Sequence, residues 1–262
     1  MDRLRLPIKI DKNVRNGGGL MEGLAISFVT ETSSFRDPGG QLYHSCLPLP
    51  SYTTLVGLAG AALGMSFQDS LFYFKKHNIH VGVKGVSLGG GKDLWNYSKI
   101  ASEKNPGKDI LKREFLYRLQ GCLYYACSKE QIIKDLAEAF SSPVYALTLG
   151  NSDDLVKIID IRYFDDVKEI ESTDLKNTVI AEDISTNYAL DWEKIKQSPI
   201  RLTLKVPTIK SLPVDFEFDK KGSRTGKRYE VFSFVGDLEK LKKPALVYCF
   251  GEDNIPMFSA GG

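Results

Sequence analysis

Residues Ser34–Met65 decide the fold of this chain, and they read SFRDPGGQLYHSCLPLPSYTTLVGLAGAALGM. A polar, turn-rich segment that carries Arg36 runs into Pro48 and Pro50, and prolines at these positions keep the chain extended up to the start of a helix. Thr53 follows soon after and is expected to cap that helix through its hydroxyl group. The stretch therefore predicts a loop and then a helix that begins at a fixed point.

Side-chain bulk is nearly absent from the predicted helix, which covers roughly residues 53–64. Its small residues are Gly57, Ala59, Gly60, Ala61, Ala62 and Gly64. Each glycine lowers helix stability by ~1 kcal/mol relative to alanine. The helix is therefore expected only if close packing against a sheet offsets that loss.

The pattern around this helix predicts an α+β fold. Residues 87–109 are rich in glycine and lysine and are expected to form a long, flexible loop. The order β-α-β-β-α-β is the split βαβ, ferredoxin-like (RRM-like) arrangement that many RNA-binding modules use. Strands are expected at 24–29, 79–86, 115–126 and 144–149, and further helices at 68–76 and 130–140.

Three parts of the chain differ in character. Residues 1–20 carry three glycines at 17–19 and form an N-terminal extension or arm, residues 21–150 form the ferredoxin-like domain, and residues 151–262 form a smaller β-rich region. The elements expected in this last region are strands at 156–161, 200–206 and 246–250, a surface segment at 173–192, and a hairpin over 216–234 with a basic tip.

The formal net charge of +2 hides an uneven distribution. Residues 75–118 hold ten Lys/Arg and four acids, residues 151–193 hold four and twelve, and residues 194–228 hold ten and three. Two basic segments separated by an acidic one are typical of a molecule whose positive face tracks a phosphate backbone. Ordinary solvated surfaces give the same pattern, and charge alone slightly favours that second interpretation.

Several kinds of site and location are disfavoured by composition. The four cysteines have no CxxC spacing and the chain has three histidines, so no metal site and no cofactor is expected. Scattered cysteines are typical of a reduced, cytoplasmic protein. The N-terminus lacks the apolar segment of a signal peptide, and no apolar run reaches the ~18 residues of a membrane span. We therefore expect no membrane association.

A second glycine-rich segment, Gly89-Gly90-Gly91-Lys92, shares part of a phosphate-loop pattern. Val86 stands where the first glycine is required, and Asp93 follows the lysine in place of Ser or Thr. ATP binding is therefore disfavoured, and the segment is interpreted as part of the mobile loop.

The motifs quoted above carry a resemblance to a known family. They are Ser34-Phe35-Arg36, Pro48-x-Pro50, Tyr52-Thr53-Thr54-Leu55, Gly57-Leu58 and Gly60-Ala61-Ala62-Leu63-Gly64, together with the later PVYALTLG at 143–150. The chain resembles the fifth family of CRISPR-associated (Cas) proteins, the RAMP-type Cascade subunit that holds the 5′ handle of the guide RNA. The motifs frame residues 23–150, and no comparable match follows residue 160. The resemblance implies the same ferredoxin-like fold.

The resemblance also implies where RNA would bind. Family members carry a thumb in this part of the fold, here at about 87–113, whose cations would meet phosphates and whose Trp95 would stack on a base; the alternative is a lysine-rich surface loop. Arg36 would contact RNA beside the 5′ end, or form an ion pair with Asp37. Tyr52 would contact RNA or pack in the core. The complete set of expected RNA-binding residues is Arg36, Tyr52, Lys92, Trp95, Lys99, Lys104, Lys108, Lys112, Arg113, Lys220, Lys221 and Arg224.

One branch of the resembled family cuts precursor RNA without metal, using a tyrosine and an adjacent lysine and histidine. Here the nearest candidate pair is Lys108-Asp109, and an aspartate beside the scissile phosphate would oppose that chemistry. His44 is expected to be structural or solvated. We therefore predict no catalytic residues.

The sequence thus predicts a non-catalytic crRNA-binding subunit of a type I CRISPR Cascade complex, which caps the backbone at the crRNA 5′ handle in antiviral defence. The implied partners are the guide crRNA, the Cascade backbone subunit, the Cascade large subunit and target DNA within the complex. The alternatives are a metal-independent endoribonuclease that processes precursor crRNA, and a ferredoxin-like interaction module unrelated to RNA.

Overall fold

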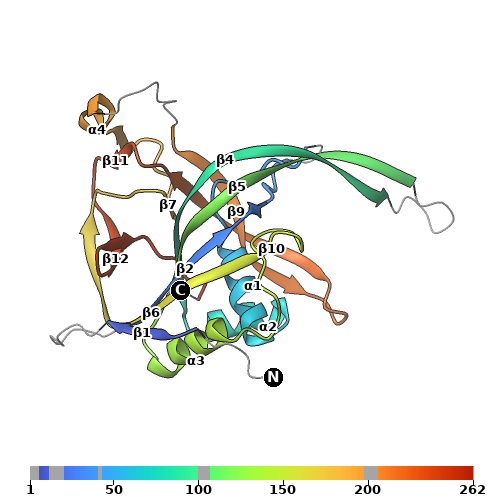
Figure 1. The fold of residues 1–262 in the computed structure, drawn as a ribbon, viewed down its shortest axis with the longest axis horizontal. Coiled ribbons are helices and arrows are strands. Elements are labelled where there is room, and N and C mark those ends of the chain that lie inside the picture. The colour runs from blue at the N-terminus through green and yellow to red at the C-terminus, as the bar shows by residue number, and fades with distance from the viewer. Residues whose placement is uncertain (1–5, 12–20, 41–42, 100–106, 198–205, 262) are drawn as a thin grey trace.

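Eleven strands form one curled, mostly antiparallel sheet in the computed structural model, and four helices accompany it (Figure 1). The structure describes residues 6–11, 21–40, 43–99, 107–197 and 206–261, and these counts refer to them. The helices are α1 (Tyr52–Leu63), α2 (Phe67–Lys76), α3 (Glu130–Ser141) and α4 (Trp192–Gln197). The strands are β1 (Ile8–Asp11), β2 (Met21–Thr30), β3 (Thr32–Ser33), β4 (His80–Lys99), β5 (Gly107–Cys127), β6 (Val156–Ser172), β7 (Thr178–Ile180), β8 (Tyr188–Leu190), β9 (Thr208–Phe218), β10 (Arg224–Val235), β11 (Glu239–Leu241), β12 (Ala245–Phe250) and β13 (Asp253–Ile255).

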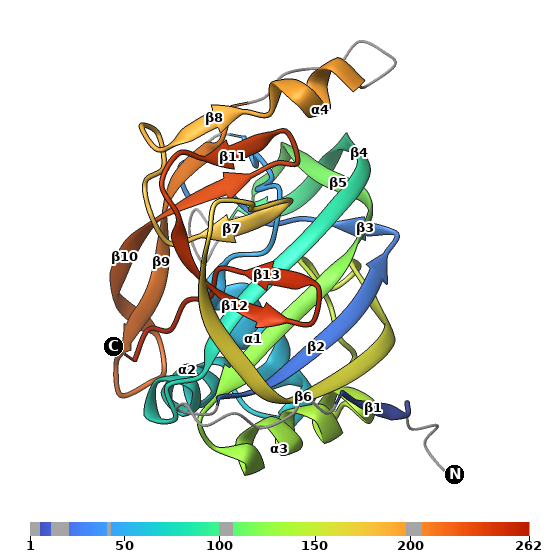
Figure 2. The same cartoon turned by 90° about the vertical axis from the view of Figure 1, so that its left-hand side faces the viewer.

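Four strands make the centre of the sheet, in the order β6-β2-β5-β4, each antiparallel to its neighbour. The connection from β2 to β4 contains α1 and α2, and the connection from β5 to β6 contains α3. These helices lie together beside the central strands (Figure 2). The main hydrophobic core lies between them and the sheet, and includes Ile26, Leu123 and Leu136. The predicted α+β class is confirmed.

The first helix begins as expected after Pro50, but its cap is not Thr53. Ser51 occupies the N-cap position without a capping side-chain hydrogen bond, and Thr53 lies within the first turn. The glycines also face a different neighbour from the one expected. A Cβ on Gly60 would overlap the Ser70 hydroxyl, so close packing against α2, rather than against the sheet, is what the small residues permit.

The predicted strand at 144–149 is wrong, and β6 takes its place as the strand beside β2. The backbone N–H groups of Val144 and Tyr145 donate to the carbonyls of Ala62 and Ala61, at 3.0 and 3.3 Å. These carbonyls belong to the last turn of α1, where intrahelical donors run out, although the Ala61 carbonyl also accepts from the Gly64 N–H at 3.3 Å. The segment therefore satisfies the end of a helix instead of joining the sheet.

The C-terminal region extends the same sheet at both edges. Strands β7, β10 and β9 continue beyond β4, and β12 and β13 continue beyond β6. The hairpin β12–β13 lies in front of the central strands in Figure 2. It covers a second hydrophobic cluster that includes Tyr124, Phe164 and Phe250. The expected strand at 246–250 lies within β12, and the expected hairpin over 216–234 is β9–β10.

Two other expectations are changed by the fold. Residues 173–192 are not simply a surface segment, because Leu175, Ile180 and Ile184 are buried in a third hydrophobic cluster. Within residues 1–20, Ile8–Asp11 forms β1, which pairs in parallel with β6. Most of the strand expected at 200–206 lies outside the described residues.

No single helix of the described chain is long and apolar enough to cross a membrane. Helices α1 and α2 taken together have the length and composition, but they are bent by 105° relative to each other.

Candidate nucleic-acid interface

A long hairpin replaces the flexible loop that the sequence predicted at 87–109. Strands β4 and β5 pair from His80↔Ala126 to Lys99↔Gly107 without a register shift, and residues 100–106 between them lie outside the described residues. Even the three glycines, Gly89 to Gly91, are paired strand residues. The outer half of the hairpin projects from the body of the molecule (Figure 1).

The loop at 34–46 lies along the root of this hairpin. The His44 N–H donates to the Lys112 carbonyl at 3.1 Å, and the Glu114 N–H donates to the His44 carbonyl at 2.8 Å. This parallel bridge fixes Tyr43 and His44 against β5. The opening motif of the sequence and the predicted thumb therefore meet at one place.

One face of the root carries Tyr43, Lys92 and Glu114. The Tyr43 hydroxyl donates to Glu114, and the Lys92 ammonium lies 3.4 Å from the same carboxylate. The hydrogen bond from Tyr43, followed by contacts with Cys46 and Lys92, holds the pKa of Glu114 below its usual value although burial opposes this. Lys92 is 57% exposed, so it remains open to solvent while sharing its charge with Glu114.

The other face carries Arg113, Asp93, Trp95 and His44. Arg113 donates two hydrogen bonds to Asp93, at 2.6 and 3.1 Å, and its guanidinium lies 5.8 Å from the centre of the Trp95 ring. The Trp95 ring is 43% exposed, and the His44 ring lies 6.2 Å from it. Trp95 is thus held in place by its neighbours with part of its ring open, whereas the charge of Arg113 is largely balanced by Asp93.

His44 is flanked by two arginines. Burial lowers the pKa of His44, and the charges of Arg36 and Arg113 lower it further, so the imidazole is uncharged at neutral pH. Asp37 does not pair with Arg36, because its carboxylate lies 2.7 Å from Lys210 and also accepts from the Gly39 N–H. Arg36 is therefore an exposed cation without an ion pair within the described part of the chain.

Other expected residues fall in different places. Lys108 and Lys112 are exposed on the hairpin, and Lys99 ends β4. Lys104 lies outside the described residues. Tyr52 is 4% exposed, and its ring meets Phe258 edge-on at 5.1 Å, so it presents no surface to RNA and is a core residue. Burial raises the pKa of its hydroxyl group to about 12.

The basic tip of β9–β10 is a separate site beside α2. Lys220 and Lys221 are exposed, and the Asp219 carboxylate shapes the turn by accepting from two backbone N–H groups. The Arg224 guanidinium lies 4.4 Å from the Phe67 ring and 4.8 Å from the Phe216 ring. The structure does not bring this tip to the β4–β5 hairpin, and it gives Arg224 a packing role.

A buried carboxylate, Asp154, joins the two quoted motifs and was not singled out from the sequence. It is 2% exposed and accepts hydrogen bonds from Thr32 at 2.7 Å, Ser34 at 2.5 Å and the Asn151 N–H at 2.9 Å. Gly150, the last residue of PVYALTLG, lies against it with a φ of +133°. The sequence feature that could have pointed to Asp154 is the turn-forming composition of residues 150–154. Such composition is too common to identify a structural carboxylate.

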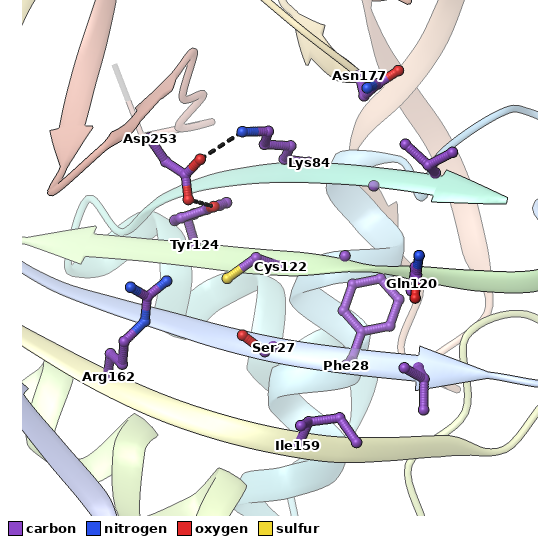
Figure 3. A pocket seen from close by; sticks show the side chains of 14 residues that line it. Ser27, Phe28, Lys84, Gln120, Cys122, Tyr124, Ile159, Arg162, Asn177 and Asp253 are labelled. Atoms are coloured by element: carbon purple, nitrogen blue, oxygen red, sulfur yellow. Dashed lines mark hydrogen bonds and ion pairs between the residues drawn. The ribbon is translucent and has the colours of Figure 1, made fainter. Parts of the chain in front are cut away.

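The face of the sheet away from the helices holds a pocket of about 450 Å³ (Figure 3). Lys84, Tyr124 and Asp253 form a network at one end, where Asp253 lies 2.5 Å from the Lys84 ammonium and accepts from the Tyr124 hydroxyl at 2.7 Å. Arg162 lies beside this network, and Gln120 lies at the other end (Figure 3). No cluster of three or more metal-binding side chains occurs among the described residues.

These features define an α+β protein with a curled antiparallel sheet, helices beside its central strands and a projecting hairpin that carries exposed cations. The chain belongs to the family described as CRISPR-associated protein (Cas_Cas5), whose profile matches residues 23–226. The resemblance drawn from the motifs is confirmed, and the match extends well past residue 160. No protein with curated annotation matches the chain.

Several solved structures are similar to this chain at low identity. A crystal structure of a CRISPR protein from Archaeoglobus fulgidus shares 14% identity with a TM-score of 0.47, over 91% of this chain and 99% of that one. A chain of a CRISPR RNA-guided surveillance complex gives 14% and 0.47, over 90% and 91%. A crystal structure of a Cas protein gives 20% and 0.35, and the match covers 51% of this chain and 59% of that chain.

Proposed function

We propose that this protein is a non-catalytic crRNA-binding subunit of a type I CRISPR Cascade effector complex, which caps the backbone at the crRNA 5′ handle. Membership of the Cas5 family supports a place in a CRISPR effector complex. The observation that carries RNA binding is the projecting β4–β5 hairpin, with exposed Lys92, Lys108 and Lys112 and a half-open Trp95 ring. Cations that track phosphates, combined with an aromatic ring on which a base can stack, are the usual elements of single-strand binding.

We also propose that the unit from β2 to β6 is a ferredoxin-like, RAMP-type module. Its strand order, β6-β2-β5-β4, and its alternation of strands and helices support this assignment. In this interpretation the hairpin is a thumb made by lengthening the two adjacent strands β4 and β5. A paired hairpin presents its cations at fixed positions, so less conformational entropy is lost on binding than with a flexible loop.

The proposed partners follow from this role. They are the guide crRNA, the backbone subunit, the large subunit and target DNA within the complex, and the protein would act in the cytoplasm. Base pairing by the guide would select the target, while the protein would recognise the RNA through its backbone and shape.

The test uses purified full-length protein and labelled repeat RNA from the same host, with EDTA present. Affinity is measured on native gels at several salt concentrations for the wild type and for the double variant Lys108→Gln/Lys112→Gln. Each lost phosphate contact reduces the slope of log K against log salt by about 0.7 for a single strand, so the double variant is expected to reduce it by about 1.4.

A matched control removes two lysines elsewhere. Lys242 and Lys243 are exposed beside β11, far from the hairpin, and the variant Lys242→Gln/Lys243→Gln has the same net charge as the test variant. It is expected to leave the slope unchanged. If both double variants lower the slope equally, the hairpin is not the RNA-binding element and only overall charge matters.

A metal-independent endoribonuclease is the second candidate, and His44 is the observation that favours it. An uncharged imidazole can accept the proton of a 2′-hydroxyl group, and Arg36 beside it could stabilise the charged phosphorane. Against this, the other flanking cation, Arg113, is held by two hydrogen bonds to Asp93.

Denaturing gels of the same reactions distinguish the two candidates. RNA that is bound but intact after long incubation supports the non-catalytic role. A discrete cut upstream of the 5′ handle that disappears in His44→Ala, with RNA binding retained, would establish the nuclease. The double variant Lys108→Gln/Lys112→Gln then serves as a control, because it weakens RNA binding while it keeps His44, the candidate general base.

A further inference from the structure

The pocket on the open face of the sheet contains a cation, Arg162, that has no ion pair among the described residues. Arg162 comes from β6 and lies 5.8 Å above the ring of Phe164. Its nearest carboxylate in the pocket is Asp253, which is already engaged by Lys84 and Tyr124. No salt bridge joins Arg162 to a carboxylate of the described residues, although its side chain is partly buried. A guanidinium in this setting is available to an anion.

The other end of the pocket has a different character. Gln120 provides an exposed carboxamide, its partner Val86 on β4 is 47% exposed, and Ile159 on β6, two strands away, is 49% exposed. Small side chains, Ser27 and Cys122, lie between the two ends (Figure 3). The pocket therefore has one end that can bind an anion. Its other end is apolar apart from the Gln120 carboxamide, which can both donate and accept a hydrogen bond.

This combination fits the chemistry of a nucleotide. A phosphate would pair with the guanidinium of Arg162, and a base would lie beside Val86 with its edge toward Gln120. A glutamine carboxamide can donate and accept at the same base edge, as it does with adenine. The volume of about 450 Å³ falls in the usual range for small-ligand sites.

We propose that this pocket binds one unstacked nucleotide of single-stranded RNA, with its phosphate on Arg162 and its base against Gln120. The proposal rests on the RNA-binding function proposed above and adds a second contact on the open face of the sheet. The same chemistry would accept a free mononucleotide, so the experiment includes both.

Fluorescence anisotropy with labelled repeat RNA and the full-length protein tests the phosphate contact. Arg162→Gln is expected to weaken binding about tenfold, the usual effect of one charge-assisted hydrogen bond, and to reduce the salt slope by about 0.7. Arg162→Lys is expected to restore the slope. Lys157→Gln removes an exposed charge from the same strand and is expected to change affinity by less than about twofold.

RNAs with a single abasic position test the base contact. For the wild-type protein, an abasic nucleotide at one position of the RNA is expected to weaken binding several-fold. For the Gln120→Ala variant, the same abasic RNA is expected to bind as well as the intact RNA does. A competition titration with AMP shows whether the pocket prefers free nucleotides.

The outcomes separate this proposal from the one on which it rests. If the wild type binds RNA and Arg162→Gln binds equally well, the pocket proposal is wrong while the hairpin proposal stands. If AMP binding depends on Arg162 but RNA binding does not, the pocket accepts free nucleotides and the RNA assignment is overturned. If the wild type does not bind RNA at all, both proposals fail. Thermal unfolding of each variant confirms that a loss of affinity is not a loss of fold.

Discussion

Gly150 shows how much one backbone conformation can determine. Its φ of +133° is open to glycine and strained for other residues, and a Cβ there would lie 2.6 Å from the backbone nitrogen and oxygen of Ser34. The same residue lies against Asp154, which holds Thr32 and Ser34. Residue 150 therefore fixes where the chain after α3 meets the loop that leads to α1.

Gly150→Ala is expected to lower the free energy of unfolding by about 1–3 kcal/mol, because the variant must strain its backbone and displace Ser34 or Asp154. Urea unfolding followed by circular dichroism measures the effect. Gly89→Ala is the control, since a Cβ there has no neighbour within 4 Å, and it is expected to be neutral or stabilising by about 0.5 kcal/mol. Equal losses in both variants would show that Gly150 has no special role.

The environment of Asp37 predicts how the stability of the fold depends on pH. Burial alone would raise its pKa, but hydrogen bonds from Lys210, the Gly39 N–H and Ser45 hold it below the usual value. A carboxyl group with a lowered pKa stabilises the fold above about pH 4 and loses that effect as the pH falls through its folded pKa. Asp37→Asn is thus expected to destabilise the fold by about 1 kcal/mol at pH 7, and the difference is expected to disappear as the pH falls below the folded pKa of Asp37. A constant difference across that range would exclude the ion pair as its cause.

At the scale of single residues, sequence reasoning identified types of side chain but not their partners. Arg113 was expected to meet phosphates, yet Asp93 neutralises it from the paired strand. Asp93 and Arg113 become neighbours only through the register of β4 and β5, which cannot be known while the segment is taken for a loop. For the same reason, the meeting of His44 with Trp95 was not foreseen.

At the scale of elements, periodic segments were predicted well and the hairpin was missed. The strand at Leu24–Val29 and the helix at 130–140 have clear apolar periods, and both are present as β2 and α3. The outer hairpin has no buried face, so its strands show no such period; Leu94 and Ile110 are 69% and 62% exposed. The outer hairpin is stabilised by pairing between its two strands. The segment that separates these strands in the sequence gives no clear secondary-structure signal.

This exposure predicts that the outer hairpin can be removed without unfolding the protein. Replacing residues 94–112 with Asn-Gly joins Asp93 to Arg113 through a turn suited to a hairpin. The unfolding temperature is expected to change by only a few degrees, since the lost side chains lie outside the core, while RNA affinity is expected to fall more than about tenfold. RNA binding that survives this deletion would move the binding site to the body of the protein.

At the scale of the whole molecule, the two halves of the sequence share one sheet. Strand β6 lies after residue 150 but pairs with nearly the whole length of β2. Ile161 in β6 is fully buried in the main core. The boundary drawn near residue 150 from composition marks a change in charge, whereas strand pairing and the core extend across it.

A fragment of residues 1–150 is therefore expected not to fold cooperatively. It would leave β2 as an unpaired edge and expose the core residues that β6 covers. Urea unfolding of this fragment is expected to give no sharp transition, whereas the full chain is expected to give one. A fragment that unfolds as sharply as the full chain would show that the first 150 residues form an independent domain.

The hairpin also has an unpaired side. Beyond Lys84, β4 is bonded to β5 alone among the described strands, so its outer edge presents free N–H and C=O groups from Val86 outward. Such an edge is a template for aggregation, because another copy of the chain can add a strand to it. Lys92 and Asp93 interrupt the edge with charges, in the way that gatekeeper residues protect exposed strands. Replacing them with apolar residues would make the purified protein prone to precipitate, so part of this basic character serves solubility as well as binding.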